Sequence, residues 1–269
     1  MNHHPDGPPP REEETSADDR TVGSRDLTRW KTPAGRALAS WVQRLSFRLG
    51  RHGALILMVV AGAVIAGLLT AVAGEVYEAV AESDGVAALD RPVLDAVKRL
   101  RSPAVDAAVT GYSALAGETV LPVVALVAII ILTLRQRTWT PFVLIVIAGA
   151  GSLFMTVVGK QLIGRARPPL VDAVPPFEYS PSFPSGHTLN SFVIAGIIAY
   201  LILLRGHSLR VRASALALAA GFAVTIGLSR VFLGHHWLTD VLVAWTLGAA
   251  WLAIVITVHR LHLTLRRKS

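Results

Sequence analysis

Six long stretches without a charged side chain limit what this sequence can fold into. They are residues 54–73, 119–134, 138–159, 188–204, 213–229 and 241–258. Each approaches the roughly 20 residues that a helix needs to cross the hydrocarbon core of a bilayer. Only 16% of the residues are charged and 52% are hydrophobic, whereas an average soluble domain is about 25% charged. The sequence therefore predicts an all-α, polytopic membrane protein with a bundle of six transmembrane helices.

The bounds of two of these stretches can be drawn in more than one way. The second can be extended backward through Glu118 into the uncharged residues 107–117. The first ends in an A-x-A pattern at residues 71–73, as at a signal-peptide cleavage site. About 50 residues precede that stretch, however, and its apolar core is too long for a signal peptide. We expect an uncleaved first helix.

The distribution of Lys and Arg predicts the orientation of the bundle, because these residues favour cytoplasmic loops. With both termini inside the cell, the basic residues of the cytoplasmic segments outnumber those of the outer segments. The loops after the first, third and fifth spans then face the outside. We expect a multi-pass protein of the cell membrane with cytoplasmic N- and C-termini.

The parts of the chain around the spans differ in composition. Residues 1–30 are predicted to be a disordered cytoplasmic tail, 31–51 a basic amphipathic segment, 52–260 the six-helix domain, and 261–269 a basic cytoplasmic tail. Residues 86–101 read as a short amphipathic helix on the outer surface. The net charge of +8 is spread over the ends of apolar runs, which indicates membrane anchoring and not nucleic-acid binding. Cysteine is absent from the sequence, which excludes a thiolate metal site or nucleophile.

Three clusters of polar residues fall at the outer ends of the last four spans, where such groups are costly unless they have a function. The first is Lys160 with Arg167 and Pro168, and the second is Pro184-Ser185-Gly186-His187. The third runs from Ser229-Arg230 through His236 to Asp240. In the predicted topology all three clusters lie on the outer face of the membrane.

The first property of these clusters is that they can bind phosphate. Lys160, Arg167 and Arg230 supply three positive charges, and a guanidinium group can hold two phosphate oxygens at once. Ser185 can donate its hydroxyl. Gly186 is predicted at a helix N-terminus, where free N–H groups and the helix dipole favour an anion. With these cations and no clustered carboxylates, neither a metal ion nor another cofactor is expected.

The second property is reactivity. His236 and Asp240 are four residues apart, so on a helix the carboxylate can fix the imidazole tautomer and leave the other ring nitrogen free to attack phosphorus. We therefore expect His236 to be the nucleophile. His187 can protonate the leaving oxygen and later activate water. The expected reaction is a two-step displacement through a phosphohistidine.

The same residues carry a family resemblance. Lys160-x6-Arg167-Pro168, Pro184-Ser185-Gly186-His187 and Ser229-Arg230-x5-His236-x3-Asp240 match the three-part signature of the type-2 phosphatidic acid phosphatase superfamily, in the same order. The resemblance implies a six-helix bundle with an extracytoplasmic site. It implies phosphate-binding roles for Lys160, Arg167, Ser185, Gly186 and Arg230, and it makes His187 the acid, His236 the nucleophile and Asp240 its partner.

The resemblance leaves several substrates and activities open. We expect a lipid phosphate substrate, with undecaprenyl or another polyprenyl diphosphate, or a broad range of lipid phosphates, as the first choice. The alternatives are phosphatidylglycerophosphate, phosphatidate, or transfer of phosphate to another lipid. The related vanadate haloperoxidases are soluble, which the apolar spans disfavour, and a protein that only binds lipid has no need of the acid and the nucleophile. Membrane lipids are the expected surroundings, and the oligomeric state is left open.

Overall fold

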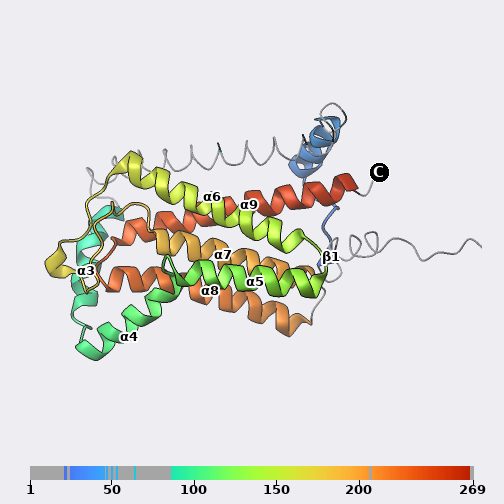
Figure 1. Ribbon diagram of the computed structural model, residues 1–269. Helices are drawn as coiled ribbons and strands as arrows, with labels where there is room; N and C mark the ends of the chain where they lie inside the picture. The colour runs from blue at the N-terminus through green and yellow to red at the C-terminus, as the bar shows by residue number, and fades with distance from the viewer. Residues whose placement is uncertain are drawn as a thin grey trace, which may run out of the picture.

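The computed structural model describes residues 25–45, 86–205 and 208–266, together with Thr21–Val22 and single positions between 46 and 64. Within this part the chain is helical, apart from the antiparallel pair β1 (Thr21–Val22) and β2 (Arg25–Asp26). Long helices run side by side as a bundle (Figure 1): α5 (Val120–Gln136), α6 (Thr140–Ile163), α7 (Gly186–Leu204), α8 (Leu209–Phe232) and α9 (Leu238–Arg266). Shorter helices lie at one end: η1 (Val86–Leu89), α3 (Asp90–Lys98), α4 (Pro103–Ser113), η2 (Ala114–Ala116) and η3 (Leu170–Asp172).

The predicted spans from the second to the sixth coincide with α5 to α9, and the first span, residues 54–73, lies outside the described residues. Helices α6 to α9 are long and apolar enough to cross a membrane. Helix α5 meets the same test only when joined to Pro103–Ala116, from which it is bent by 47°. The described chain thus contains four apolar spans, or five if the bent pair counts as one. The six-span count and the orientation stay predictions.

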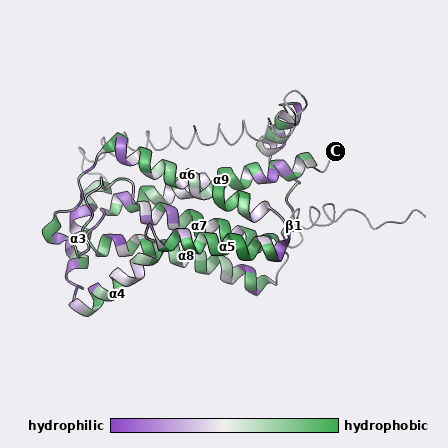
Figure 2. Ribbon diagram, in the orientation of Figure 1, coloured by the Kyte–Doolittle hydropathy of each residue, from purple (hydrophilic) through white to green (hydrophobic). Residues whose placement is uncertain are grey.

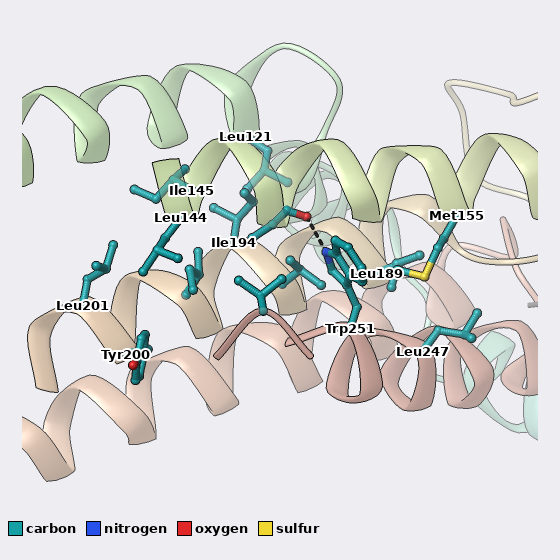
Figure 3. Packing of buried hydrophobic residues seen from close by; sticks show 14 of the residues in the cluster. Leu121, Leu144, Ile145, Met155, Leu189, Ile194, Tyr200, Leu201, Leu247 and Trp251 are labelled. Carbon is teal, nitrogen blue, oxygen red and sulfur yellow. Dashed lines mark hydrogen bonds between the residues drawn. The ribbon is translucent and has the colours of Figure 1, made fainter. Parts of the chain in front are cut away.

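Helix α7 lies in the middle of the bundle and supplies much of its core. Its buried residues Leu189, Val193 and Ile197 pack with side chains of α6 and α9 (Figure 3). Between those two neighbours, the Trp251 Nε1 donates a hydrogen bond to the Ala148 carbonyl over 3.0 Å. Close helix approach of this kind depends on small residues in membrane bundles. A Cβ added at Gly151 would lie 2.1 Å from the Trp251 ring, so only glycine fits there.

The outer surface of the bundle is apolar over its middle. Figure 2 shows hydrophobic residues along the length of the long helices and hydrophilic ones concentrated toward the two ends. Leu126, Leu153 and Leu218 are each more than half exposed, which in water would be an unusually large apolar patch. Such a surface fits a bilayer, in agreement with the predicted membrane location.

The end of the bundle at the C-terminus carries the predicted amphipathic segment. Residues 33–45 are helical, and Ala39 and Val42 pack against Leu261 and Leu265 near the end of α9. The Arg260 guanidinium also lies 4.4 Å above the Trp30 ring. Ordered structure is therefore present in parts of both predicted tails, residues 1–30 and 261–269.

In the predicted C-terminal tail, which begins at residue 261, helix α9 continues to Arg266, because its last turns bury leucines against the N-terminal helix. In the predicted N-terminal tail, which ends at residue 30, the last residues are also ordered. Residues 25–30 are placed by the β1–β2 pair, by a hydrogen bond from Arg260 Nε to the Leu27 carbonyl, and by one from Trp30 Nε1 to Thr264 Oγ1.

The opposite end of the bundle is tied together by α3 and the segment that follows it, and the short amphipathic helix predicted over 86–101 is confirmed as η1 and α3. Arg91 and Lys98 both form ion pairs with Asp172 in the loop between α6 and α7. Arg101 donates to the carbonyls of Phe232 and Asp172. These contacts fix the 164–185 loop against the end of α8.

We expect this end of the bundle to face the outside of the cell. Val171 in the loop is 91% exposed, whereas Leu209 at the other end is 79% exposed, and the chain has no cysteine of its own. In intact cells, a membrane-impermeant maleimide is expected to label the Val171→Cys variant. The Leu209→Cys variant should react only after lysis, and the reverse pattern would contradict the orientation.

Candidate active site

The structure brings all the predicted site residues to the end of the bundle that carries α3 (Figure 1). Each comes from the end of a long helix or from a connection between two. They are Lys160 in the last turn of α6, Arg167 in the following loop, Ser185, Gly186 and His187 at the start of α7, Arg230 in the last turn of α8, His236 before α9, and Asp240 in its first turn. The contacts below join them into one site.

His236 and Asp240 face each other as their spacing predicts. The His236 Nδ1 lies 3.6 Å from the Asp240 Oδ2, which is slightly too long for a direct hydrogen bond. The Ser182 hydroxyl contacts both groups, 2.5 Å from that carboxylate oxygen and 3.4 Å from the imidazole nitrogen. Both side chains are buried. Asp240 and Ser182 together orient the Nδ1 side of the ring.

The other nitrogen of His236 faces a cation. The His236 Nε2 lies 3.2 Å from an Arg167 guanidinium nitrogen. Burial lowers the pKa of His236 from its ordinary 6.5 to about 4, a shift that the Asp240 carboxylate opposes and Arg167 increases. At neutral pH the imidazole is therefore uncharged and Nε2 can keep its lone pair, as a nucleophile requires.

Arg167 is held in place mainly by backbone groups. It donates to the carbonyls of Ser180 and His235, each over 2.6 Å. The Ser180 hydroxyl in turn accepts from Lys160 Nζ over 2.9 Å, and Lys160 also donates to the Pro181 carbonyl. Two of the three predicted cations are thus anchored by one short stretch of the proline-rich loop. Fixed donors of this kind lose little freedom when an anion binds.

Arg230 is the most deeply buried of the three cations, with 3% of its side chain exposed. One of its terminal nitrogens donates to Ser113 Oγ at the end of α4 over 3.0 Å. Its Nε has no hydrogen-bond partner among the described residues. A buried N–H without a partner is costly, so this donor is available to an oxygen of a bound anion.

A carboxylate that the sequence analysis did not single out already occupies the space between two of the cations. Glu178 pairs with Arg167 through Oε2 over 2.8 Å and with Arg230 through Oε1. Burial alone would raise the pKa of Glu178, but the two arginines outweigh it and lower the pKa to about 2. The paired guanidinium groups therefore hold an anion in this structure, and the anion comes from the chain itself.

The start of α7 forms the remaining wall of the site. The Ser185 hydroxyl is 2.8 Å from the Thr188 hydroxyl, and the Ser185 N–H points to the Asp240 carbonyl at 3.5 Å. A Cβ added at Gly186 would lie 3.0 Å from the Thr156 methyl group. Glycine is thus needed there for the packing of α7 on α6, in addition to the access for an anion that the sequence analysis proposed.

The two remaining histidines of the site have different surroundings. His187 interacts electrostatically with Glu178 and Arg230, and its Nε2 lies beside Gly117, 3.7 Å from where a Cβ of that residue would be. His235 is buried, and its Nε2 is 2.7 Å from the Val174 carbonyl, which is consistent with a role in fixing the loop.

Some residues that complete the site were missed in the sequence analysis. They are Glu178, Ser182, Arg165, Ser113 and Asp90. A signal existed for Glu178, because it is the only charged residue between Ala173 and Gly186. Arg165 was counted only toward the membrane orientation, although it stands two residues before Arg167. Ser113 and Asp90 lie far away in the sequence, and no local pattern points to them.

Comparisons with known proteins point to one family of membrane phosphatases. The model of the PAP2 superfamily matches residues 139–263. Phosphatidylglycerophosphatase B of Bacillus subtilis (strain 168) is 31% identical over 175 residues, which cover 64% of this chain and 84% of that protein. The crystal structure of a transmembrane PAP2-type phosphatidylglycerolphosphate phosphatase from Bacillus subtilis superposes with a TM-score of 0.60. It is 25% identical, and the match covers 73% of this chain and 93% of that one.

The Glu178 carboxylate should compete with an added anion for Arg167 and Arg230. Replacing Glu178 with Gln keeps the shape and removes the charge, so both guanidinium groups become available. We expect inorganic vanadate, which resembles the transition state of phosphate transfer, to inhibit the Glu178→Gln variant at a concentration about tenfold lower than the unaltered protein. This tenfold change in the inhibition constant corresponds to about 1.4 kcal/mol of binding free energy.

Asp172 provides the control for this prediction. It is also an ion-paired carboxylate of the same loop, but its partners are Arg91 and Lys98. The Asp172→Asn variant should leave the inhibition constant for vanadate unchanged. A constant that rises in Glu178→Gln would mean that the carboxylate aligns the arginines and does not compete with the anion.

Proposed function

Because the chain belongs to the PAP2 superfamily, we propose that it is a membrane lipid phosphatase that hydrolyses a phosphate monoester through a phosphohistidine on His236. The observation that carries this proposal is the placement of the His236 ring. Its Nδ1 faces Asp240 and Ser182, and its Nε2 faces the Arg167 guanidinium. A phosphate bound to the arginine lies next to the ring nitrogen that retains a lone pair.

The first chemical step is attack of His236 Nε2 on phosphorus. The P–N bond forms while the bond from phosphorus to the lipid oxygen breaks, and His187 gives its proton to that leaving oxygen. The three non-reacting oxygens are bound by Arg167, Arg230 and Lys160. These cations stabilise the negative charge that is spread over the three oxygens in the transition state. Asp240 stabilises the positive charge that develops on the imidazole.

The second step releases phosphate. His187, now neutral, takes a proton from water, and the water oxygen attacks phosphorus as the P–N bond breaks. His236 returns to the neutral form, and inorganic phosphate leaves with the proton balance restored. The same intermediate could pass its phosphate to another lipid hydroxyl, which would make the enzyme a phosphotransferase; hydrolysis is the simpler outcome for a site at the water-facing end of the bundle.

Phosphatidylglycerophosphate is the first candidate for the substrate. The polyprenyl diphosphate preferred in the sequence analysis rested on composition and on the expected outer-face location. Similarity to a phosphatidylglycerophosphatase over 84% of that protein's length is the stronger argument, and it favours the alternative. The extracytoplasmic position of the site remains part of the proposal and is supported by the distribution of basic residues.

The assignment of the two histidines can be tested separately. The His236→Ala variant is expected to lose both turnover and the acid-labile phosphoenzyme, because the ring nitrogen proposed to attack phosphorus is removed. The His187→Ala variant should retain vanadate binding and become slowly phosphorylated by substrates with a good leaving group. Mass spectrometry of a quenched reaction identifies the modified residue, and phosphate found on His187 would contradict the assignment.

Turnover should not require a metal ion, because three cations and the N-terminus of α7 supply the positive charge that a metal would provide. With purified protein in detergent, we expect release of phosphate from phosphatidylglycerophosphate to continue in excess EDTA. Loss of activity in EDTA that magnesium restores would refute this. Phosphatidate and undecaprenyl diphosphate should be tested in the same assay. Faster turnover of undecaprenyl diphosphate than of phosphatidylglycerophosphate would favour a polyprenyl substrate.

A further inference from the structure

Arg165 lies between two buried carboxylates beside the proposed nucleophile. One of its terminal nitrogens donates to Asp240 Oδ1 over 2.5 Å, and the other donates to Asp90 Oδ2 over 2.8 Å. The exposed fractions of these side chains are 12% for Arg165, 0% for Asp240 and 6% for Asp90. The guanidinium group is thus a buried bridge between the start of α9 and α3.

The contact with Arg165 determines how Asp240 is oriented. The other oxygen of that carboxylate, Oδ2, accepts hydrogen bonds from Ser182 Oγ and from the Trp237 N–H, and it faces His236. With both oxygens engaged, the carboxylate cannot rotate about its Cβ–Cγ bond. A buried carboxylate that loses its charged partner is strongly destabilised and changes its position or protonation.

Asp90 binds both Arg165 and the start of α9, and so fixes their positions relative to each other. Its two oxygens accept from the Thr239 N–H over 2.9 Å and from the Thr239 hydroxyl over 2.7 Å. The Arg165 guanidinium also donates to that hydroxyl and lies 5.5 Å from the centre of the Trp237 ring. Helix α3 therefore caps the helix that carries Asp240 and fixes the cation that pairs with it.

We propose that Arg165, anchored by Asp90, is a positioning residue for the proposed nucleophile. It acts on His236 through Asp240 and not through the phosphate. The inference rests on the proposed role of His236. It separates the two arginines of the R-x-R segment: Arg167 faces the anion from one side of the His236 ring, and Arg165 holds the carboxylate on the other side.

The test is a double-mutant cycle between Arg165 and Asp240. Because Arg165 acts through the carboxylate, the Arg165→Gln variant should lower kcat by roughly 10²-fold, as expected for a misoriented imidazole. KM and the inhibition constant for vanadate should change by less than about threefold. In an Asp240→Asn background the same change should have little further effect on kcat, because coupled residues are non-additive.

Arg101 is the matched control for this cycle. It also ties the site loop to its neighbours, but through the carbonyls of Phe232 and Asp172. Any loss of kcat in Arg101→Gln should therefore be the same with and without Asp240→Asn. The Asp90→Asn variant should show a milder loss, about tenfold, that is not additive with Arg165→Gln. The Arg165→Lys variant keeps the positive charge, and it provides a second test if the Arg165→Gln variant does not fold.

Two outcomes would overturn the inference. One is a loss in Arg165→Gln that multiplies with the loss in Asp240→Asn, and the other is weaker vanadate binding, which would place Arg165 among the phosphate ligands. Failure of the proposed function is distinguishable. In that case the unaltered protein gives no phosphohistidine at His236, whereas an additive cycle with an intact phosphohistidine refutes only the role of Arg165.

Discussion

The buried charge of Asp240 is the constraint on which the site depends. Its side chain has no exposed surface, and an isolated carboxylate in such a place is highly unfavourable. Four groups from two segments compensate for it: Arg165 and Ser182 in the loop, and the His236 ring and the Trp237 N–H just before α9. The loop must therefore close over the start of α9, and this closure brings Arg167 to the face of the imidazole.

Membrane folding explains why so many charged groups meet at one end of the bundle. The middle of each long helix has to be apolar, so ionic groups are restricted to the ends and connections. At this end they neutralise one another in alternating order, from Asp90 through Arg165 to Asp240, and from Arg167 through Glu178 to Arg230. The first series holds Asp240 beside the proposed nucleophile, and the second contains the cations of the proposed anion site.

The sequence was sufficient for much of this arrangement. Runs without charge located α5 to α9, because their composition is imposed by the bilayer and is visible locally. Three short motifs predicted residues that the fold brings together, because helix ends that alternate in direction return to the same face. The contact between the N- and C-terminal segments was not predicted, since it depends on packing of Val42 on Leu261, which no local pattern reveals.

The pairings within the site were the least accessible to sequence reasoning. Glu178 is joined to Arg230 across 52 residues and Asp90 to Arg165 across 75, so their contacts follow from the fold and not from spacing. The contacts of Ser182 with His236 and Asp240 could not be predicted for the same reason. Spacing alone predicted a direct contact of the two side chains, and the loop places Ser182 Oγ within 2.5 Å of the carboxylate.

The pairing of Arg165 with both Asp90 and Asp240 also bears on the order in which the protein is made. Asp90 and Arg165 leave the ribosome well before α9, so their ion pair can form while the last helix is still being synthesised. In the unfinished bundle, Arg165 and Asp90 can then already be paired with each other. When α9 is inserted, its Thr239 and Asp240 can bind partners that are already in place. The Asp90–Arg165 pair thereby helps to position this helix.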